Sequence, residues 1–166
     1  MNVWNANSLY LYPAKLNNGL GRGRTGLESV YDGDTISNMI LDLGFNRYMV
    51  TSVRLLGIDT PELRTKSKVE KIKGYQARDM LRMLIGENDL IFESVSKKGT
   101  GKYGRALGNL WINTGVKCDE DGRITQKIWD NAGDKLIECG LAVAYDGGTK
   151  AKDWSLDEWR KNIDKR

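Results

Sequence analysis

"LESVYDGDTISNMILDLGFNRYMVTSVRLLGI", residues 27–58, is the part of the sequence from which the architecture follows. Three runs in it are rich in β-branched, aromatic and other apolar residues that alternate with polar ones, a pattern typical of strands that bury one face. Turn signals at residues 32–34, Asp-Gly-Asp, and at residues 44–46, Gly-Phe-Asn, separate the runs. We therefore expect a three-stranded antiparallel meander.

The rest of the chain adds helices and two further strands. Residues 69–86 change to helical spacing, and Gly86 is a typical helix end. The expected apolar stripe of this helix consists of Ile72, Ala77, Met80, Leu81 and Leu84. Residues 89–97 and 105–113 read as strands, and we expect a helix over residues 126–139. A capping-box pattern, in which Glu158 follows Ser155 by three residues, predicts a short last helix.

Five strands with a helix after the third match a small Greek-key barrel of the OB type. The expected fold class is therefore α+β, mainly a β-barrel, with about three helices packed on it. Residues 8–16 also read as a strand, and Pro13 indicates an edge position. We assign residues 1–24, with their Gly- and Arg-rich loop, to an N-terminal extension and residues 25–166 to the OB-fold domain.

Composition excludes several kinds of chemistry. The 166 residues include no histidine, which removes Ser-His and Cys-His catalysis and histidine-ligated zinc. The two cysteines, Cys118 and Cys139, are too few for a disulfide scaffold or a zinc site. No apolar run reaches the length of a membrane span, and the start of the chain lacks a secretory pattern, so we expect a cytoplasmic protein with no membrane partner.

Positive charge is concentrated in two stretches, although the net charge is only +4. Residues 64–78 carry six Lys or Arg residues against the single Glu70, and residues 97–105 carry four with no acid. Such clusters suit a polyanion because bound phosphates release counterions, but a solvated basic surface explains them equally well. The loop of residues 17–26 contains a G-x-G-x-x-G pattern without the strand and helix that a dinucleotide site requires.

Two acidic motifs and two arginines point to phosphate chemistry. "DGDT" at residues 32–35 and "DTPE" at residues 59–62 supply four carboxylates, and oxygen ligands of this kind suit Ca²⁺ or Mg²⁺. Arg54 and Arg105 supply bidentate donors for phosphate oxygens. A cation and two guanidiniums around one phosphate stabilise the charge that develops during phosphodiester cleavage. Each motif alone also reads as an ordinary turn or loop.

Five motifs in order resemble the staphylococcal (micrococcal) nuclease family. They are "VYDGDTI", "VRLLGIDTPE", "GYQA", "KYGRALGNLW" and "LIECGLAVAYDGG", and they extend over about residues 25–148. The hairpin "LDLGFN" and the closing "AYDGG" are similar to the phage-encoded branch, which would place the protein in an infected cell. Residues 1–24 have no clear counterpart in the family's type member, and the connection of residues 115–126 is enlarged relative to it.

The resemblance implies a role for each motif. It implies that the carboxylates of Asp34 and Asp59 and the backbone carbonyl of Thr60 bind Ca²⁺, while Asp32 supports the turn. The preference for Ca²⁺ over Mg²⁺ rests on the resemblance alone, because both ions take oxygen ligands. Glu62 resembles the residue that orients or deprotonates the attacking water.

Five further residues would contact the substrate. Arg54 and Arg105 resemble the phosphate clamp, and Arg105 would also stabilise the leaving 5′ oxygen. Lys102, Tyr103 and Tyr145 match positions that contact the terminal phosphate or base of the nucleotide. The assignment of Tyr145 depends on a segment that is one residue shorter than in the type member.

The expected activity is that of a Ca²⁺-dependent nuclease. The resemblance implies that it would hydrolyse DNA and RNA, single-stranded or locally melted, with little sugar specificity and leave 3′-phosphates. The alternative is a non-catalytic OB-fold module that binds nucleic acid through its basic clusters. Carboxylates repel phosphate, so the full set of acids and arginines favours catalysis.

Overall fold

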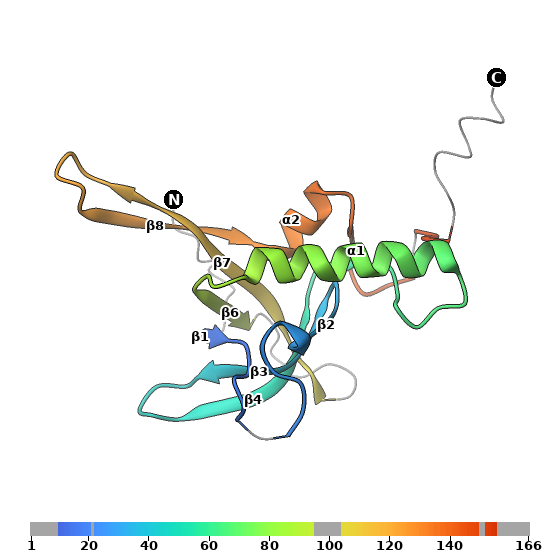
Figure 1. The fold of residues 1–166 in the computed structure, drawn as a ribbon, viewed down its shortest axis with the longest axis horizontal. Coiled ribbons are helices and arrows are strands. Elements are labelled where there is room, and N and C mark those ends of the chain that lie inside the picture. Colours follow the sequence, from blue (N-terminus) through green and yellow to red (C-terminus); the bar gives the residue numbers. More distant parts are fainter. Residues whose placement is uncertain (1–9, 21, 95–103, 150–151, 156–166) are drawn as a thin grey trace.

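The computed structural model describes residues 10–20, 22–94, 104–149 and 152–155 (Figure 1). The strands are β1 (Tyr10–Lys15), β2 (Val30–Asp32), β3 (Thr35–Asp42), β4 (Tyr48–Leu55), β5 (Ile58–Asp59), β6 (Leu90–Ser94), β7 (Ala106–Cys118), β8 (Ile124–Asn131) and β9 (Val143–Ala144). The helices are η1, a 3₁₀ turn (Gly26–Ser29), α1 (Lys68–Ile85) and α2 (Ala132–Glu138).

Five of the strands close a barrel. Neighbours follow the order β1-β6-β7-β4-β3, and β1 also pairs with β3, which completes the ring. β4 and β7 run parallel, whereas the other pairs of the ring are antiparallel. This topology confirms the expected α+β fold with an OB-type barrel. The hairpin of β3 and β4 also confirms most of the expected meander, although residues 27–29 belong to η1.

The strand β1 belongs to the barrel, although the sequence assigned it to an N-terminal extension. It pairs with β6 from Tyr10 to Ala14 and with β3 through Ala14 and Lys15. Pro13 pairs only with β6 and precedes the residues of β1 that also pair with β3. A proline has no backbone N–H to donate, so it suits a position with a partner strand on one side only. The first 24 residues therefore contribute a strand that closes the ring.

The helix α1 begins and ends close to the expected residues. The Ser67 side chain accepts a hydrogen bond from the Glu70 N–H, and the helix ends at Gly86. Ala77, Leu81 and Ile85 repeat every four residues and are buried against the barrel. Ile72, which was placed on this stripe, is 60% exposed. Five helical positions separate it from Ala77, and at about 100° per residue they turn it away from the buried face.

The helix expected over residues 126–139 is wrong in its first half. Residues 124–131 form β8, which pairs with the outer part of β7, and only Ala132–Glu138 are helical. The side chain of Asn131 caps α2 by accepting hydrogen bonds from the Gly133 and Asp134 N–H groups. The enlarged connection of residues 115–126 is thus the end of a long hairpin that reaches away from the barrel (Figure 1).

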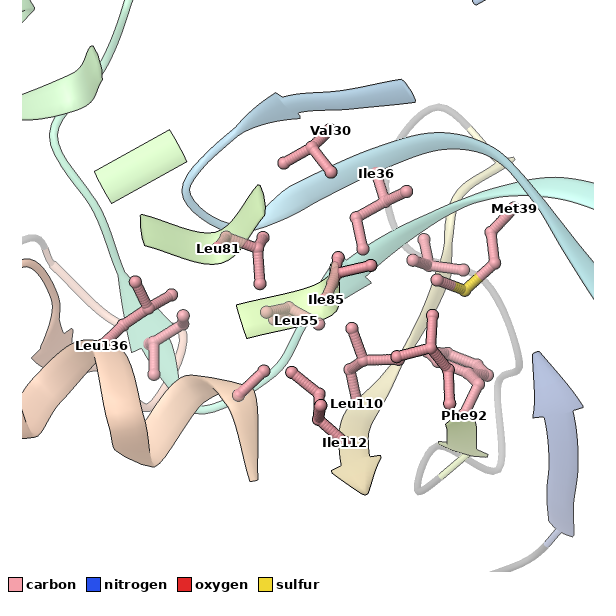
Figure 2. Close-up of a cluster of buried hydrophobic side chains, with 14 of the residues drawn as sticks. Val30, Ile36, Met39, Leu55, Leu81, Ile85, Phe92, Leu110, Ile112 and Leu136 are labelled. Carbon is pink, nitrogen blue, oxygen red and sulfur yellow. The ribbon is translucent and has the colours of Figure 1, made fainter. Parts of the chain in front are cut away.

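The core lies inside the barrel and continues under the two α-helices. Figure 2 shows Ile36, Met39, Leu55, Phe92, Leu110 and Ile112 from the strands beside Leu81 and Ile85 from α1 and Leu136 from α2. Neither α-helix within the described ranges has an apolar stretch of the length that a bilayer requires. The last expected helix, beyond Ser155, lies outside the described residues.

Candidate active site

The Asp-Gly-Asp turn joins β2 to β3 and is buried against α1. The residues Asp32 and Asp34 are 9% and 3% exposed, and the Asp34 N–H donates to Oδ1 of Asp32 at 3.4 Å. A Cβ atom on Gly33 would lie 2.7 Å from the Cβ of Ala77 and 2.9 Å from Cγ2 of Thr60. Only glycine allows this approach, so the first acidic motif touches both the helix and the second motif.

The second acidic motif is also hydrogen-bonded to α1 and packed against it. Asp59 and Thr60 are buried, whereas the side chain of Glu62 is exposed. Oε1 of Glu70 accepts a 3.3 Å hydrogen bond from the Glu62 N–H. A Cβ atom on Gly74 would lie 3.0 Å from the carbonyl oxygen of Pro61, so the loop packs directly on the helix backbone. The position of Glu62 is therefore set by the first turns of α1.

Arg54 and Arg105 meet at the same end of the barrel through one carboxylate and one hydroxyl. Nη1 of Arg54 lies 2.8 Å from Oδ2 of Asp34, and the Thr35 hydroxyl donates to the other oxygen, Oδ1, at 2.8 Å. Nη1 of Arg105 donates to the same hydroxyl at 3.4 Å. Strand register explains the meeting, because Thr35 pairs with Arg54 on β4 and Ala106 pairs with the adjacent Val53.

The carboxyl group of Asp34 is electrostatically unusual. Burial, followed by the negative charge of Asp32, raises the pKa of Asp34 to about 7. The Arg54 guanidinium acts in the opposite direction but does not offset these two effects. An added positive charge beside Asp34 would therefore favour its ionised form.

Asp59 belongs to the second acidic motif, and its neighbour Thr60 touches Gly33 of the first motif. Its strand, β5, pairs with β9, and the next residue along, Tyr145, donates its N–H to the carbonyl oxygen of Gly57 at 2.8 Å. Asp59 and Tyr145 thereby line one open hollow of about 540 Å³. Its other lining residues are Gly57, Val143, Ala144, Asp146 and Thr149.

A residue near the C-terminus, which the sequence did not single out, reaches the same carboxylate. The indole N–H of Trp154 donates to Oδ2 of Asp59 at 3.4 Å, and the Trp154 side chain is only 4% exposed. Lys73 of α1 donates to the Trp154 carbonyl oxygen at 3.3 Å. No local pattern marks Trp154, because its partner is 95 residues away in the chain.

Three of the expected site residues gather tightly, namely Asp34, Arg54 and Arg105, with Asp32 in the same turn. Asp59, Thr60 and Tyr145 lie on adjacent segments, and Glu62 lies on the loop that follows. Lys102 and Tyr103 fall outside the described residues.

Sequence reasoning missed Thr35, whose hydroxyl links Arg105 to Asp34, and Glu70, which holds the Glu62 loop. The Ser67-x-x-Glu70 pattern is a capping-box signal that could have identified Glu70.

The oxygen donors fit a hard cation. The buried carboxylate of Asp34, whose pKa is raised by its surroundings, and the buried carboxylate of Asp59 are ligand types that Ca²⁺ prefers. Within the described ranges, no three His, Cys, Asp or Glu side chains lie close enough to hold a metal by themselves. Ca²⁺ takes six to eight oxygen ligands, so backbone carbonyl groups such as that of Thr60 and water molecules would complete its coordination.

Comparison with known proteins identifies the family of the chain. The family described as "Staphylococcal nuclease homologue" matches residues 52–164, which include Arg54, Asp59, Glu62 and Arg105. Over 124 residues the chain is 31% identical to "Protein ParB" of Escherichia coli, a match that covers 75% of this chain. The aligned part spans 58% of the length of that relative. The match covers more than half of the chain, which also has the OB-type barrel, and the chain belongs to the family of staphylococcal nuclease homologues.

Proposed function

We propose that the protein is a Ca²⁺-dependent nuclease that hydrolyses phosphodiester bonds of DNA and RNA and leaves 3′-phosphates. The observation that carries the proposal is the linked group of Arg54, Asp34, Thr35 and Arg105. It brings two guanidiniums to a buried carboxylate whose pKa is raised to about 7. A module that only binds nucleic acid has no need of carboxylates at this position.

The two arginines would hold the scissile phosphate. Asp34 and Thr35 each accept a hydrogen bond or ion pair from a guanidinium, which fixes the orientation of both arginines before substrate arrives. Preorganised donors of this kind stabilise negative charge as it develops on the phosphate oxygens. Arg105 would serve the leaving 5′ oxygen, and Tyr145, Lys102 and Tyr103 would contact the nucleotide.

Glu62 would accept or orient the proton of the attacking water. Glu62 is an exposed residue, and the hydrogen bond from its N–H to Glu70 keeps the loop in place. In-line attack by water on phosphorus forms one P–O bond and breaks the bond to the 5′ oxygen, which takes up a proton. Ca²⁺ bound beside Asp34 and Asp59 would act as a Lewis acid on the phosphate oxygens.

Cleavage assays test the proposal directly. The purified protein is incubated with single- and double-stranded DNA and RNA in the presence of Ca²⁺, Mg²⁺ or a chelator, and the product ends are determined. We expect cleavage that requires Ca²⁺ and yields 3′-phosphates. Cleavage that is absent under every condition would reject the nuclease and favour the binding module.

Variants then test the roles. Glu62→Gln should slow cleavage by about 10² to 10⁴-fold, the usual contribution of a general base, and Arg105→Ala should also cause a large loss. Glu87→Gln, which changes an exposed glutamate just after α1, is the matched control and should cleave at the parental rate. Parental activity in Glu62→Gln or Arg105→Ala would refute the corresponding role.

A further inference from the structure

The described residues of the glycine- and arginine-rich loop after β1 are held by hydrogen bonds among themselves and to η1. The Asn17 side chain is fully buried, and its Oδ1 accepts a 2.8 Å hydrogen bond from the Leu20 N–H. The Asn17 carbonyl oxygen accepts another, at 2.7 Å, from the Gly26 N–H. The Ser29 hydroxyl donates to the Arg24 carbonyl oxygen at 3.0 Å. These bonds fix the backbone that carries Arg24.

Arg24 stacks on an aromatic ring that a second arginine shares. Its guanidinium carbon lies 4.8 Å from the ring centroid of Tyr31, and that of Arg64 lies 5.5 Å from the same centroid. The two arginines come from loops 40 residues apart, and both are exposed. A guanidinium that stacks on a ring keeps its N–H groups available at its edge, where they can bind phosphate oxygens in a bidentate manner.

Two further guanidiniums, those of Arg78 and Arg82, lie on α1 beside β2. Nη2 of Arg82 donates to the Val30 carbonyl oxygen at 3.1 Å, immediately before Tyr31. Burial lowers the pKa of Arg82, and the positive charges of Arg78 and Arg24 add to this effect. The carboxylates of Glu28 and Asp79 act in the opposite direction. Arg24, Arg64, Arg78 and Arg82 thus bring four guanidiniums to neighbouring segments, and positive charge gathered in this way suits a polyanion.

We propose that Arg24, Tyr31 and Arg64 form an arginine–tyrosine surface that binds the phosphate backbone of nucleic acid beyond the scissile phosphate. The inference rests on the proposed nuclease function and extends it to the length of substrate that the protein holds. Arg78 and Arg82 add positive potential to this surface without contacting the phosphates of the nucleic acid themselves.

The place of this surface favours nucleic acid over an acidic protein. Tyr31 directly precedes Asp32 in the turn of the candidate active site, and Arg64 follows Glu62 by two residues. A polynucleotide with one phosphate at Arg54 and Arg105 carries further phosphates along its strand. The arginine–tyrosine surface offers cations for these phosphates next to the site. An acidic peptide would have no reason to bind so close to the site.

Binding measured without cleavage tests the inference. The affinity of the full chain for a long single-stranded DNA is followed by fluorescence anisotropy in a chelator, over a range of salt concentrations. Each lost phosphate contact should reduce the slope of log K against log salt by about 0.7, which corresponds to about fivefold in affinity at about 0.1 M salt. Arg24→Ala combined with Arg64→Ala should therefore weaken binding by about 25-fold.

The matched control removes two other exposed arginines. Arg47 and Arg123 lie in the β3–β4 and β7–β8 turns, so Arg47→Ala combined with Arg123→Ala lowers the net charge equally. This control should keep the parental salt slope. Tyr31→Phe, which keeps the ring, should bind as the parent does, whereas Tyr31→Leu should weaken binding because the arginines lose their platform.

Each outcome has a definite reading. Equal losses in the two double variants would overturn the inference, because net charge alone would explain binding. Competition by polyglutamate as strong as that by DNA would overturn it in favour of an acidic protein partner. If the Arg24 and Arg64 variant keeps the parental affinity while the protein still cleaves DNA, the surface is refuted and the nuclease stands. If the parent protein does not cleave nucleic acid under any condition, the proposed function fails separately.

Discussion

Replacement of Asp34 by asparagine should stabilise the cation-free protein, and more so at high pH. The residue is 3% exposed, its carboxyl group lies beside Asp32, and the pKa of that group is raised to about 7 in the fold. In the unfolded chain the pKa returns to its ordinary value of 3.8. The unfolded state therefore binds fewer protons than the native state between these two values, and stability falls as pH rises through this window.

The size of the effect follows from the two pKa values. At pH 5 the carboxyl group is protonated in the native state and mostly ionised in the unfolded state. This difference lowers the free energy of unfolding by about 2 kcal/mol. At pH 8 both forms are ionised, and the cost reaches about 4 kcal/mol. An asparagine side chain does not titrate, so the advantage of the Asp34→Asn variant over the parent should grow by about 2 to 3 kcal/mol from pH 5 to pH 8.

Urea unfolding in the presence of a chelator measures this difference. The free energy of unfolding of parent and variant is determined at pH 5 and at pH 8, and Asp42→Asn, at the far end of β3, serves as the control. A gap between parent and Asp34→Asn that stays the same at both pH values would refute the raised pKa. Added Ca²⁺ should stabilise the parent at pH 8 but not Asp34→Asn, because a cation favours the ionised carboxylate.

Two further substitutions test the packing around the site. Gly33→Ala places a Cβ atom 2.7 Å from that of Ala77 and should lower the free energy of unfolding by about 1 to 3 kcal/mol. The control is Gly115→Ala, whose new Cβ would have its nearest neighbour at 3.6 Å and should cost less. Equal losses in chemical denaturation would contradict the close approach at Gly33. Trp154→Phe removes the indole donor to Asp59 but keeps a ring, and should lower the free energy of unfolding by about 1 kcal/mol. An unchanged midpoint would show that this hydrogen bond does not contribute.

Local patterns predicted most of the barrel and much of the site. The meander and α1 could be predicted because alternation, turn residues and caps act within a few residues of one another. The β8 strand could not, since Ile124 and Ile128 also have the spacing of a helical face, and only pairing with β7 selects the strand. Trp154 could not be predicted either, because a contact across 95 residues leaves no local signal.

The motif "GYQA" of α1 positions the two acidic loops. It supplies no acid or base, yet its Gly74 receives the Pro61 carbonyl and its Ala77 receives Gly33. The helix therefore acts as a common surface against which both carboxylate loops are positioned. Catalytic groups that move by about 1 Å can lose about 10²-fold in rate, so a methyl group added at either contact would affect the chemistry without touching a reacting atom. Gly74 and Ala77 therefore position the proposed site without taking part in its chemistry.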